Sequence, residues 1–245
     1  TTSGSGSEVT AFSILTHNGV KHPLIDDKLC PHMAILDTGL LEKLPKSIIA
    51  DGGFDVLSHA LEALVAVNSN EVTDALAKAA FSAAYGNLPA SFTGNLAARE
   101  KMHNASTMAG IAFNQAGLGM CHSIAHALGG AFHIPHGRLN AILLPAVITC
   151  NAHLAGHKYA TLARGAGFVG MADSVAVRNL KNALVRLSKE LGMPQTLKEA
   201  GVEPREVWHK TDALVTAALQ DACSKTNPMP VEAFMVRRVL EAVTG

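Results

Sequence analysis

Apolar residues recur at helical spacing along most of this chain, from residue 46 almost to its end. Alanine and leucine dominate this part, and side chains three or four positions apart lie on one face of a helix. The pattern therefore predicts a series of helices, which Gly and Pro residues end or cap. The expected ranges are 38–44, 46–67, 71–88, 94–114, 120–131, 136–154, 157–165, 172–192, 196–200, 204–217 and 231–243.

The first 37 residues follow a different pattern. Residues 8–15 and 22–25 favour β structure and flank a turn signal at 17–19, which predicts a small hairpin, and residues 33–37 predict one further extended segment. Only 4% of residues are aromatic, so the core must consist of closely packed Ala, Leu and Val side chains. The expected fold is mainly α and multi-helical, with a β-hairpin near the N-terminus.

The bulk composition narrows the classes of ligand. A chain of 245 residues that is 48% hydrophobic can bury a core. Basic and acidic residues number 20 each and only 16% of residues are charged, which argues against nucleic acid and anionic membranes as partners. No uninterrupted apolar run reaches the roughly 18 residues that a membrane helix needs. The expected ligand is therefore a small molecule.

Two further features concern the compartment and the extent of the chain. Four widely spaced cysteines without a Cys-x-x-Cys pair indicate reduced thiols, as in the cytoplasm. The sequence opens with Thr-Thr-Ser-Gly-Ser-Gly and lacks an initial methionine. We expect it to be part of a longer gene product.

The densest candidate chemistry is a histidine cluster. Four of the 12 histidines, His122, His126, His133 and His136, fall within fifteen residues. His122 and His126 have the spacing that places two side chains on one face of a helix, and His136 follows a proline, at a turn or the first turn of the next helix. Imidazole is the commonest metal ligand in proteins. His133 lies between two apolar residues and is interpreted as a loop residue.

A second pair has the same spacing. Asp55 and His59 are four residues apart, so a carboxylate and an imidazole share one helix face, with Glu62 either exposed or supporting a ligand. One carboxylate and two or three imidazoles suit Fe²⁺ or Zn²⁺ better than Mg²⁺ or Ca²⁺. The alternatives are hydrogen-bonded core or interface histidines and an Asp–His pair on a hydrated face. The remaining histidines stand alone and are expected at the surface or at helix caps: His17, His22, His32, His103, His153, His157 and His209.

The N-terminal segment is rich in hydroxyls and glycine. Residues Thr1–Glu8 have a composition that lets backbone amides and side-chain oxygens approach a phosphate, a ribose or a nicotinamide amide. The segment matches neither the P-loop nor the Gly-x-Gly-x-x-Gly fingerprint. A plain loop or a linker therefore remains an alternative.

These motifs occur together in one order: the Thr/Ser/Gly start, Asp55-x-x-x-His59, Gly117-Leu-Gly-x-x-His122-Ser-Ile-Ala-His126-Ala-Leu-Gly and Pro135-His136-Gly-x-x-Asn140. In this order they resemble the iron-containing (group III) alcohol dehydrogenase family over essentially the whole chain. The resemblance is to the C-terminal, metal-binding helical domain of its dehydroquinate synthase-like fold. The tail Val236–Gly245 is similar to the members of bacterial ethanolamine utilisation.

The resemblance implies roles for nine residues. Asp55, His59, His122 and His136 would hold one divalent iron, with Zn²⁺ as the other candidate ion. His126 would be the catalytic residue beside the substrate and the nicotinamide, in proton relay or substrate orientation. The family's nicotinamide nucleotide contacts correspond to Thr1, Thr2, Ser5 and Lys21, which implies NAD as the cofactor.

The resemblance also implies an organisation and a reaction. Residues 1–37 would form the nicotinamide-side loop and hairpin, at the junction with a nucleotide-binding domain whose Gly-Gly-Gly-Ser loop this sequence lacks. Residues 38–245 would form the helical catalytic domain. The reaction would interconvert a small primary alcohol such as ethanol and its aldehyde, in a homo-oligomer of the cytoplasm or of a bacterial microcompartment. The residues alone also allow a metal-dependent hydrolase or a non-enzymatic metal-binding helical module.

Overall fold

The computed structural model describes residues 2–17 and 20–245, without the side chains of residues 14, 16, 17 and 20–23. The described part contains eight α-helices and one two-stranded antiparallel sheet, so the predicted fold class is confirmed. The elements are β1 Phe12–His17, β2 Val20–Ile25, α1 Lys46–Val65, α2 Glu71–Phe92, α3 Leu96–Ala116, α4 Met120–Phe132, α5 His136–Gly165, α6 Asp173–Glu190, α7 Pro204–Gln220 and α8 Ala233–Thr244, with 3₁₀ turns η1 Ser7–Val9, η2 Asp27–Leu29, η3 Thr38–Leu41 and η4 Ala222–Thr226.

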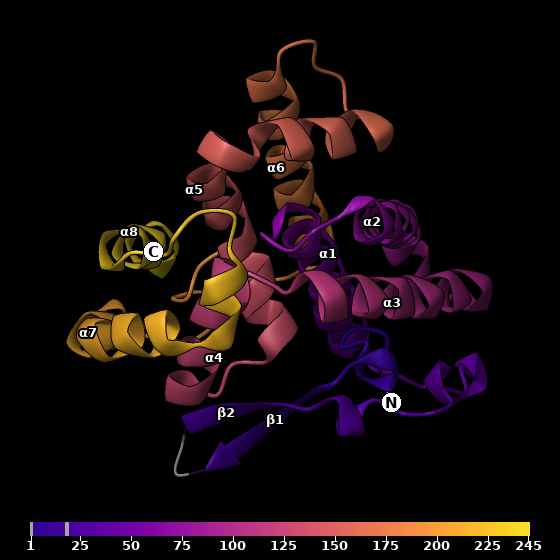
Figure 1. The fold of residues 1–245 in the computed structure, drawn as a ribbon, viewed down its shortest axis with the longest axis horizontal. Coiled ribbons are helices and arrows are strands. Elements are labelled where there is room, and N and C mark those ends of the chain that lie inside the picture. Colours follow the sequence, from indigo (N-terminus) through magenta and orange to yellow (C-terminus); the bar gives the residue numbers. More distant parts are fainter. Residues whose placement is uncertain (1, 18–19) are drawn as a thin grey trace.

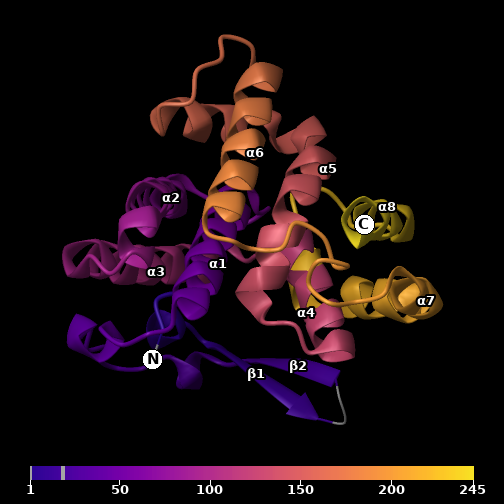
Figure 2. The same ribbon diagram turned by 180° about the vertical axis from the view of Figure 1, so that it is seen from behind.

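Helix α1 runs through the centre of the molecule. It packs against α2, α3 and α5, and every residue from Gly53 to Val65 is buried. Figure 1 shows α2 and α3 on one side of α1 and α4, α7 and α8 on the other, and the view from behind in Figure 2 shows α6 crossing the same central region. Because α1 is covered on all sides over this stretch, the polar residues on it lie in the interior.

Helix starts follow local signals in the sequence. Asn70 caps α2 by accepting from the backbone N–H groups of Val72 and Thr73, while the Thr73 hydroxyl accepts from the N–H of Asn70. Pro135 directly precedes α5 and Pro204 opens α7. Proline is favoured there because its fixed φ suits a helix start and its missing N–H would have no helical partner.

Helix α5 corrects the largest error in the predicted elements. The expected break at Gly156, between 136–154 and 157–165, is wrong, because one helix runs from His136 to Gly165 and contains Pro145. Helix α2 likewise continues past Pro89 to Phe92. Gly in a helix interior costs only about 1 kcal/mol. Packing of α5 against α1, α4, α6 and α8 outweighs that cost.

Four shorter predictions are also corrected. The helix expected at 38–44 is the 3₁₀ turn Thr38–Leu41, and 196–200 forms turns, since so short a segment does not repay helix nucleation. Residues 33–37 are not in a strand within the described part, because a strand needs a backbone partner. Strand β1 begins only at Phe12, after the turn η1.

Helix α5 is the one described helix whose length and composition would also suit a membrane span. An 18-residue window of this helix has a mean hydropathy of 1.4, and 56% of that window is buried inside the protein. Its buried Asn140 and Asn151 donate side-chain hydrogen bonds to Asp55 on α1 and to Asn227. These contacts are those of a core helix.

The N-terminal loop and the hairpin lie along one end of the helical part (Figure 1). Strand β2 packs against α4. Gly4 lies against Gly52 of α1, and Gly6, at φ 61°, lies against Gly110 of α3, where an added Cβ would be 2.8 Å from the Gly110 Cα. The glycines predicted to admit a ligand thus serve close backbone packing, which fixes Ser5 between them.

Candidate metal centre and its cleft

Three helices bring the four predicted metal ligands together. The Oδ1 atom of Asp55 lies 3.8 Å from Nε2 of His59, 3.8 Å from Nε2 of His122 and 3.5 Å from Nε2 of His136. One donor atom each from Asp55, His122 and His136 lies within 4.8 Å of the other two. His59 joins this group through Asp55, and its ring stacks on that of His122 with centroids 4.6 Å apart.

The donor atoms face one point. The amide nitrogen Nδ2 of Asn140 donates to Oδ1 of Asp55 at 2.9 Å and lies 3.4 Å from Nε2 of His122 and 3.3 Å from Nε2 of His136. Three atoms that can accept a hydrogen bond are thus directed at the single amide nitrogen of Asn140. A cation needs the same convergence of lone pairs, and a ligand set of one carboxylate and imidazoles suits Fe²⁺ or Zn²⁺. The residues therefore fit a divalent ion of this kind.

Glu62 fixes the orientation of His122. Its Oε2 lies 2.6 Å from Nδ1 of His122, and its Oε1 accepts from the backbone N–H of Cys121 at 2.6 Å. Glu62 is only 2% exposed, so of the two predicted positions the exposed one is wrong. Histidines that bind metals usually donate their second ring N–H to a carboxylate, which sets the tautomer and raises ligand basicity.

The protonation states follow from burial and charge. Burial lowers the pKa of His59 to about 4, against the pull of Asp55, and holds the pKa of His136 well below its ordinary value. Burial also opposes charge on Asp55 and His122. Three neighbouring histidines nevertheless lower the pKa of Asp55, and the carboxylates of Asp55 and Glu62 raise the pKa of His122 to about 9. The buried carboxylates thus favour positive charge at this point.

His126 lies beside the cluster and has its own partner. Its Nδ1 is 2.8 Å from Oδ2 of Asp221, whose Oδ1 accepts from the backbone N–H of Cys223 at 2.8 Å. The His126 ring stacks on the ring of His136, with centroids 5.1 Å apart. Asp221 therefore fixes the ring plane of His126 and leaves Nε2 as its free nitrogen.

One cleft of about 480 Å³ contains both the cluster and His126. Its remaining wall combines hydroxyl groups from the N-terminal loop with apolar side chains. The lining residues are Ser5, Ser7, Thr10, Phe12, Ser13, Asp55, His59, Phe113, Leu118, His122, His126, His136, Ala222 and Cys223. A cleft with an apolar wall and a few converging polar groups is typical of a small-molecule site.

The predicted nucleotide contacts are placed only in part. Ser5 lines the cleft, and its hydroxyl donates to that of Ser7 at 3.1 Å. Thr2 is exposed and is not among the described lining residues. Thr1 lies outside the described residues, as does the side chain of Lys21, whose backbone pairs with Thr16 in the hairpin.

Sequence reasoning missed several residues of the site. Asn140 is four positions after His136, so helical spacing alone places it on the same face. Asp221 is 95 residues from His126, and no local signal connects the two. Outside the lining of the cleft, His103, which was expected at the surface or at a helix cap, is buried, and its Nδ1 lies 3.1 Å from the Ser3 hydroxyl.

Comparisons with known proteins cover almost the whole chain. Residues 49–244 match the sequence profile described as Fe-containing alcohol dehydrogenase family, C-terminal. The chain is 44% identical to the 1-propanol dehydrogenase PduQ of Salmonella typhimurium over 249 residues, covering 98% of the chain and 67% of the relative. It is 40% identical to the NADPH-dependent butanol dehydrogenase of Clostridium saccharobutylicum over 244 residues, covering 99% of the chain and 63% of the relative.

A solved structure shows the same architecture. The crystal structure of a 1,3-propanediol oxidoreductase superposes with a TM-score of 0.93 at 34% identity, covering 99% of this chain and 64% of the other. The chain thus spans about two thirds of the length of these proteins.

Proposed function

Because this chain belongs to the iron-containing alcohol dehydrogenase family, we propose that it forms the metal-binding, helical part of an NAD-linked dehydrogenase for small primary alcohols and their aldehydes. The observation that carries this proposal is the convergence of Asp55 and three histidines in the cleft that also contains His126. In this proposal residues 38–245 are the catalytic domain. Residues 1–37 form the junction with the nucleotide-binding part.

Asp55, His59, His122 and His136 would hold the metal ion. When bound, a ferrous ion supplies Lewis-acid chemistry, which polarises the oxygen of the alcohol or aldehyde. The family favours iron, and zinc suits the same donor set. Glu62 holds the imidazole of His122 in one orientation, and burial keeps His59 and His136 neutral, with lone pairs free for a ligand bond.

The other cleft residues seat the substrate and move its proton. Phe12, Phe113 and Leu118 form an apolar wall that accepts a short alkyl chain and excludes water. His126, held by Asp221, accepts the hydroxyl proton of the alcohol at its free ring nitrogen and returns it to the product of aldehyde reduction. The names of the two relatives broaden the expected substrates from ethanol to propanol and butanol.

The nucleotide would meet the hydroxyl-lined wall. We assign Thr1, Thr2, Ser5 and Lys21 to the nicotinamide side of NAD. A Gly-rich loop of the nucleotide-binding part would bind the pyrophosphate. One relative is named as NADPH-dependent, so NADP is the alternative nucleotide. From the family resemblance we propose a homo-oligomer that lies in the cytoplasm or in a bacterial microcompartment.

Metal content tests this proposal directly. The chain, prepared without oxygen, is expected to hold about one divalent ion, as measured by elemental analysis. The ion is expected to be lost in His122→Ala, because removing a ligand weakens metal affinity greatly. His209→Ala, at an exposed position on α7, is the matched control and should keep the ion.

Turnover by the full-length protein decides between reaction classes. Alcohol-dependent reduction of NAD is expected, with no hydrolysis of phosphoester substrates. Hydrolysis without NAD reduction would establish the hydrolase alternative. Metal binding without either reaction would establish a non-enzymatic module, and either result overturns the dehydrogenase proposal.

A further inference from the structure

A second group of potential ligands lies on the other wall of the cleft. One donor atom each from His126, Asp221 and Cys223 lies within 4.8 Å of the other two. His126 comes from α4, Asp221 is the N-cap of η4, and Cys223 lies within that turn. The Asp221 side chain is 6% exposed and Cys223 is 7% exposed, yet both His126 and Cys223 line the cleft. An ion in the cleft can therefore reach this group.

We propose that His126, Asp221 and Cys223 form a second cation site, selective for a soft divalent ion such as Zn²⁺. Imidazole, carboxylate and thiolate are the three ligand types that zinc takes, and three protein ligands leave one position open toward the cleft. One thiolate and one carboxylate balance the charge of a divalent ion, which matters because a buried net charge is costly. The thiol proton leaves to solvent when the Cys223 sulfur binds the ion.

The two sites differ in chemical softness. The four predicted ligands of the first site offer nitrogen and oxygen only, whereas the second offers a sulfur. Soft thiolate ligands select zinc over hard cations, while imidazole and carboxylate accept iron readily. We therefore expect the two sites to respond differently to a mixture of ions, with the sulfur site filling only when zinc or a similar soft ion is present.

A metal ion bound at the second site would prevent His126 from accepting a proton. The nitrogen of His126 now 2.8 Å from Asp221 would bind the ion instead, with the ring proton moved to its other nitrogen. Since it would then carry the ring proton, this other nitrogen could not accept a proton from an alcohol. This consequence, inhibition of the dehydrogenase by excess zinc, rests on the proposed function, whereas the binding site itself does not.

Cobalt reports the sulfur ligand directly. The metal-free chain is titrated with Co²⁺ under anaerobic conditions, and a thiolate-to-cobalt charge-transfer band in the near ultraviolet is expected once the second site fills. Cys223→Ser should remove the band and weaken this binding at least about 10-fold. Cys150→Ser, at a half-buried thiol on α5 outside the cleft, is the matched control and should keep the band.

The first site and the enzyme activity are tested separately. Asp55→Ala should keep the charge-transfer band, because it alters only the sulfur-free site.

In the full-length enzyme, zinc in excess over one equivalent should inhibit the wild type and Cys150→Ser. A wild-type chain without the band, or a band that survives Cys223→Ser, overturns the second site. A band in a protein without dehydrogenase activity overturns only the proposed function.

Discussion

At the scale of single residues, Glu62 offers the sharpest test of the metal centre. Its carboxylate holds Nδ1 of His122 at 2.6 Å. Glu62→Gln keeps the shape but removes the negative charge that strengthens His122 as a ligand. We expect metal affinity to fall by about 10- to 100-fold, as measured by competition with a chelator. Glu100→Gln, at an exposed position on α3, should leave affinity unchanged. Equal affinities in the two variants would contradict a supporting role for Glu62.

The residue scale also shows what a sequence can reveal about a site. Asp55 with His59, and His122 with His126, were found because each pair shares a helix face at a spacing of four. The predicted separation of His126 from the four ligands came from family resemblance, and spacing alone does not give it. Asp221 could not be found, because packing of α7 and η4 against α4 brings it to His126 from 95 positions away.

At the scale of helices, the contact between α1 and α5 positions the metal centre. A Cβ at Gly137 would lie 1.9 Å from the Asp51 carbonyl oxygen, so the backbones of the two helices touch there. Gly137→Ala should push α5 from α1 and separate His136 from Asp55. We expect a loss of about 1–3 kcal/mol in the free energy of unfolding, measured with urea, together with weaker metal binding.

Gly156 on the same helix provides the matched control. Nothing lies within 4 Å of the position that an added Cβ would take, and the backbone there is helical. Gly156→Ala should therefore stabilise the protein by about 0.5–1 kcal/mol, since alanine loses less conformational entropy than glycine in a helix. Similar destabilisation by both substitutions would show that the α1–α5 contact is not the cause.

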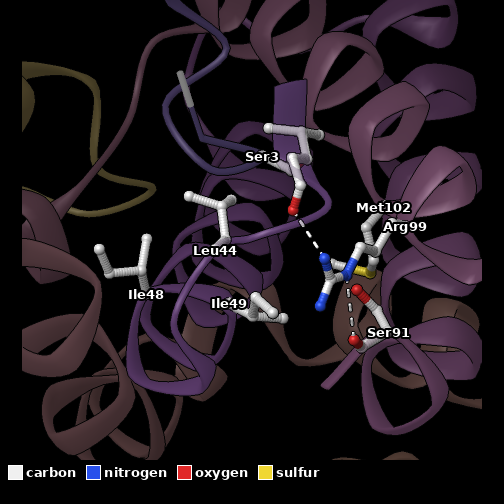
Figure 3. A pocket seen from close by; sticks show the side chains of 8 residues that line it. Ser3, Leu44, Ile48, Ile49, Ser91, Arg99 and Met102 are labelled. Carbon is white, nitrogen blue, oxygen red and sulfur yellow. Dashed lines mark hydrogen bonds between the residues drawn. The ribbon is translucent and has the colours of Figure 1, made fainter. Parts of the chain in front are cut away.

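Arg99 tests how the helical part holds the segment before α1. This buried residue of α3 donates from Nη1 to the carbonyls of Leu41, at 2.6 Å, and of Glu42, and from Nε to that of Ser91, at 3.5 Å. Figure 3 shows it among apolar side chains from that segment and from α1. Arg99→Lys should lower the free energy of unfolding in urea by about 1–3 kcal/mol, because a single ammonium nitrogen cannot take the positions of both Nη1 and Nε and reach all three carbonyls.

The exposed Arg205 at the start of α7 is the control for Arg99. Arg205→Lys should change the free energy of unfolding by less than about 0.5 kcal/mol. An equally small effect of Arg99→Lys would mean that water replaces the lost donors, and that the segment is held by its apolar contacts alone.

Helix periodicity identified most elements but not their lengths. Capping residues such as Asn70 and Pro135 placed the starts of α2 and α5 well. Gly156 and Pro89 were expected to end helices, yet tertiary packing overrides such local signals when the helix is buried. The segment 33–37 shows the opposite case. Its sequence favours a strand, but within the described part no neighbouring backbone completes one.

At the scale of the whole molecule, one end of the protein is unusually apolar. Large side chains between the hairpin and α1 are exposed, among them Met33 at 79%, Ile35 at 83% and Leu40 at 67%. Apolar side chains gathered in one segment mark an interaction surface rather than ordinary solvent-facing positions. This segment follows β2, which pairs with the part of β1 that lines the cleft. We therefore expect the nucleotide-binding part of the enzyme to cover it.

This arrangement predicts that the 245 residues alone are inactive and that the full-length enzyme is active. The 245 residues, loaded with metal, should show little or no alcohol-dependent formation of NADH, because this sequence has no Gly-Gly-Gly-Ser loop to hold the pyrophosphate. The full-length enzyme should turn over. In that enzyme Met33→Lys should lower thermal stability and activity, since it places a charge in the expected interface, whereas Met171→Lys, at a fully exposed position before α6, should change neither. Robust turnover by the 245 residues alone would show that this chain binds NAD unaided, and equal behaviour of the two lysine variants would show that the apolar segment is not the interface.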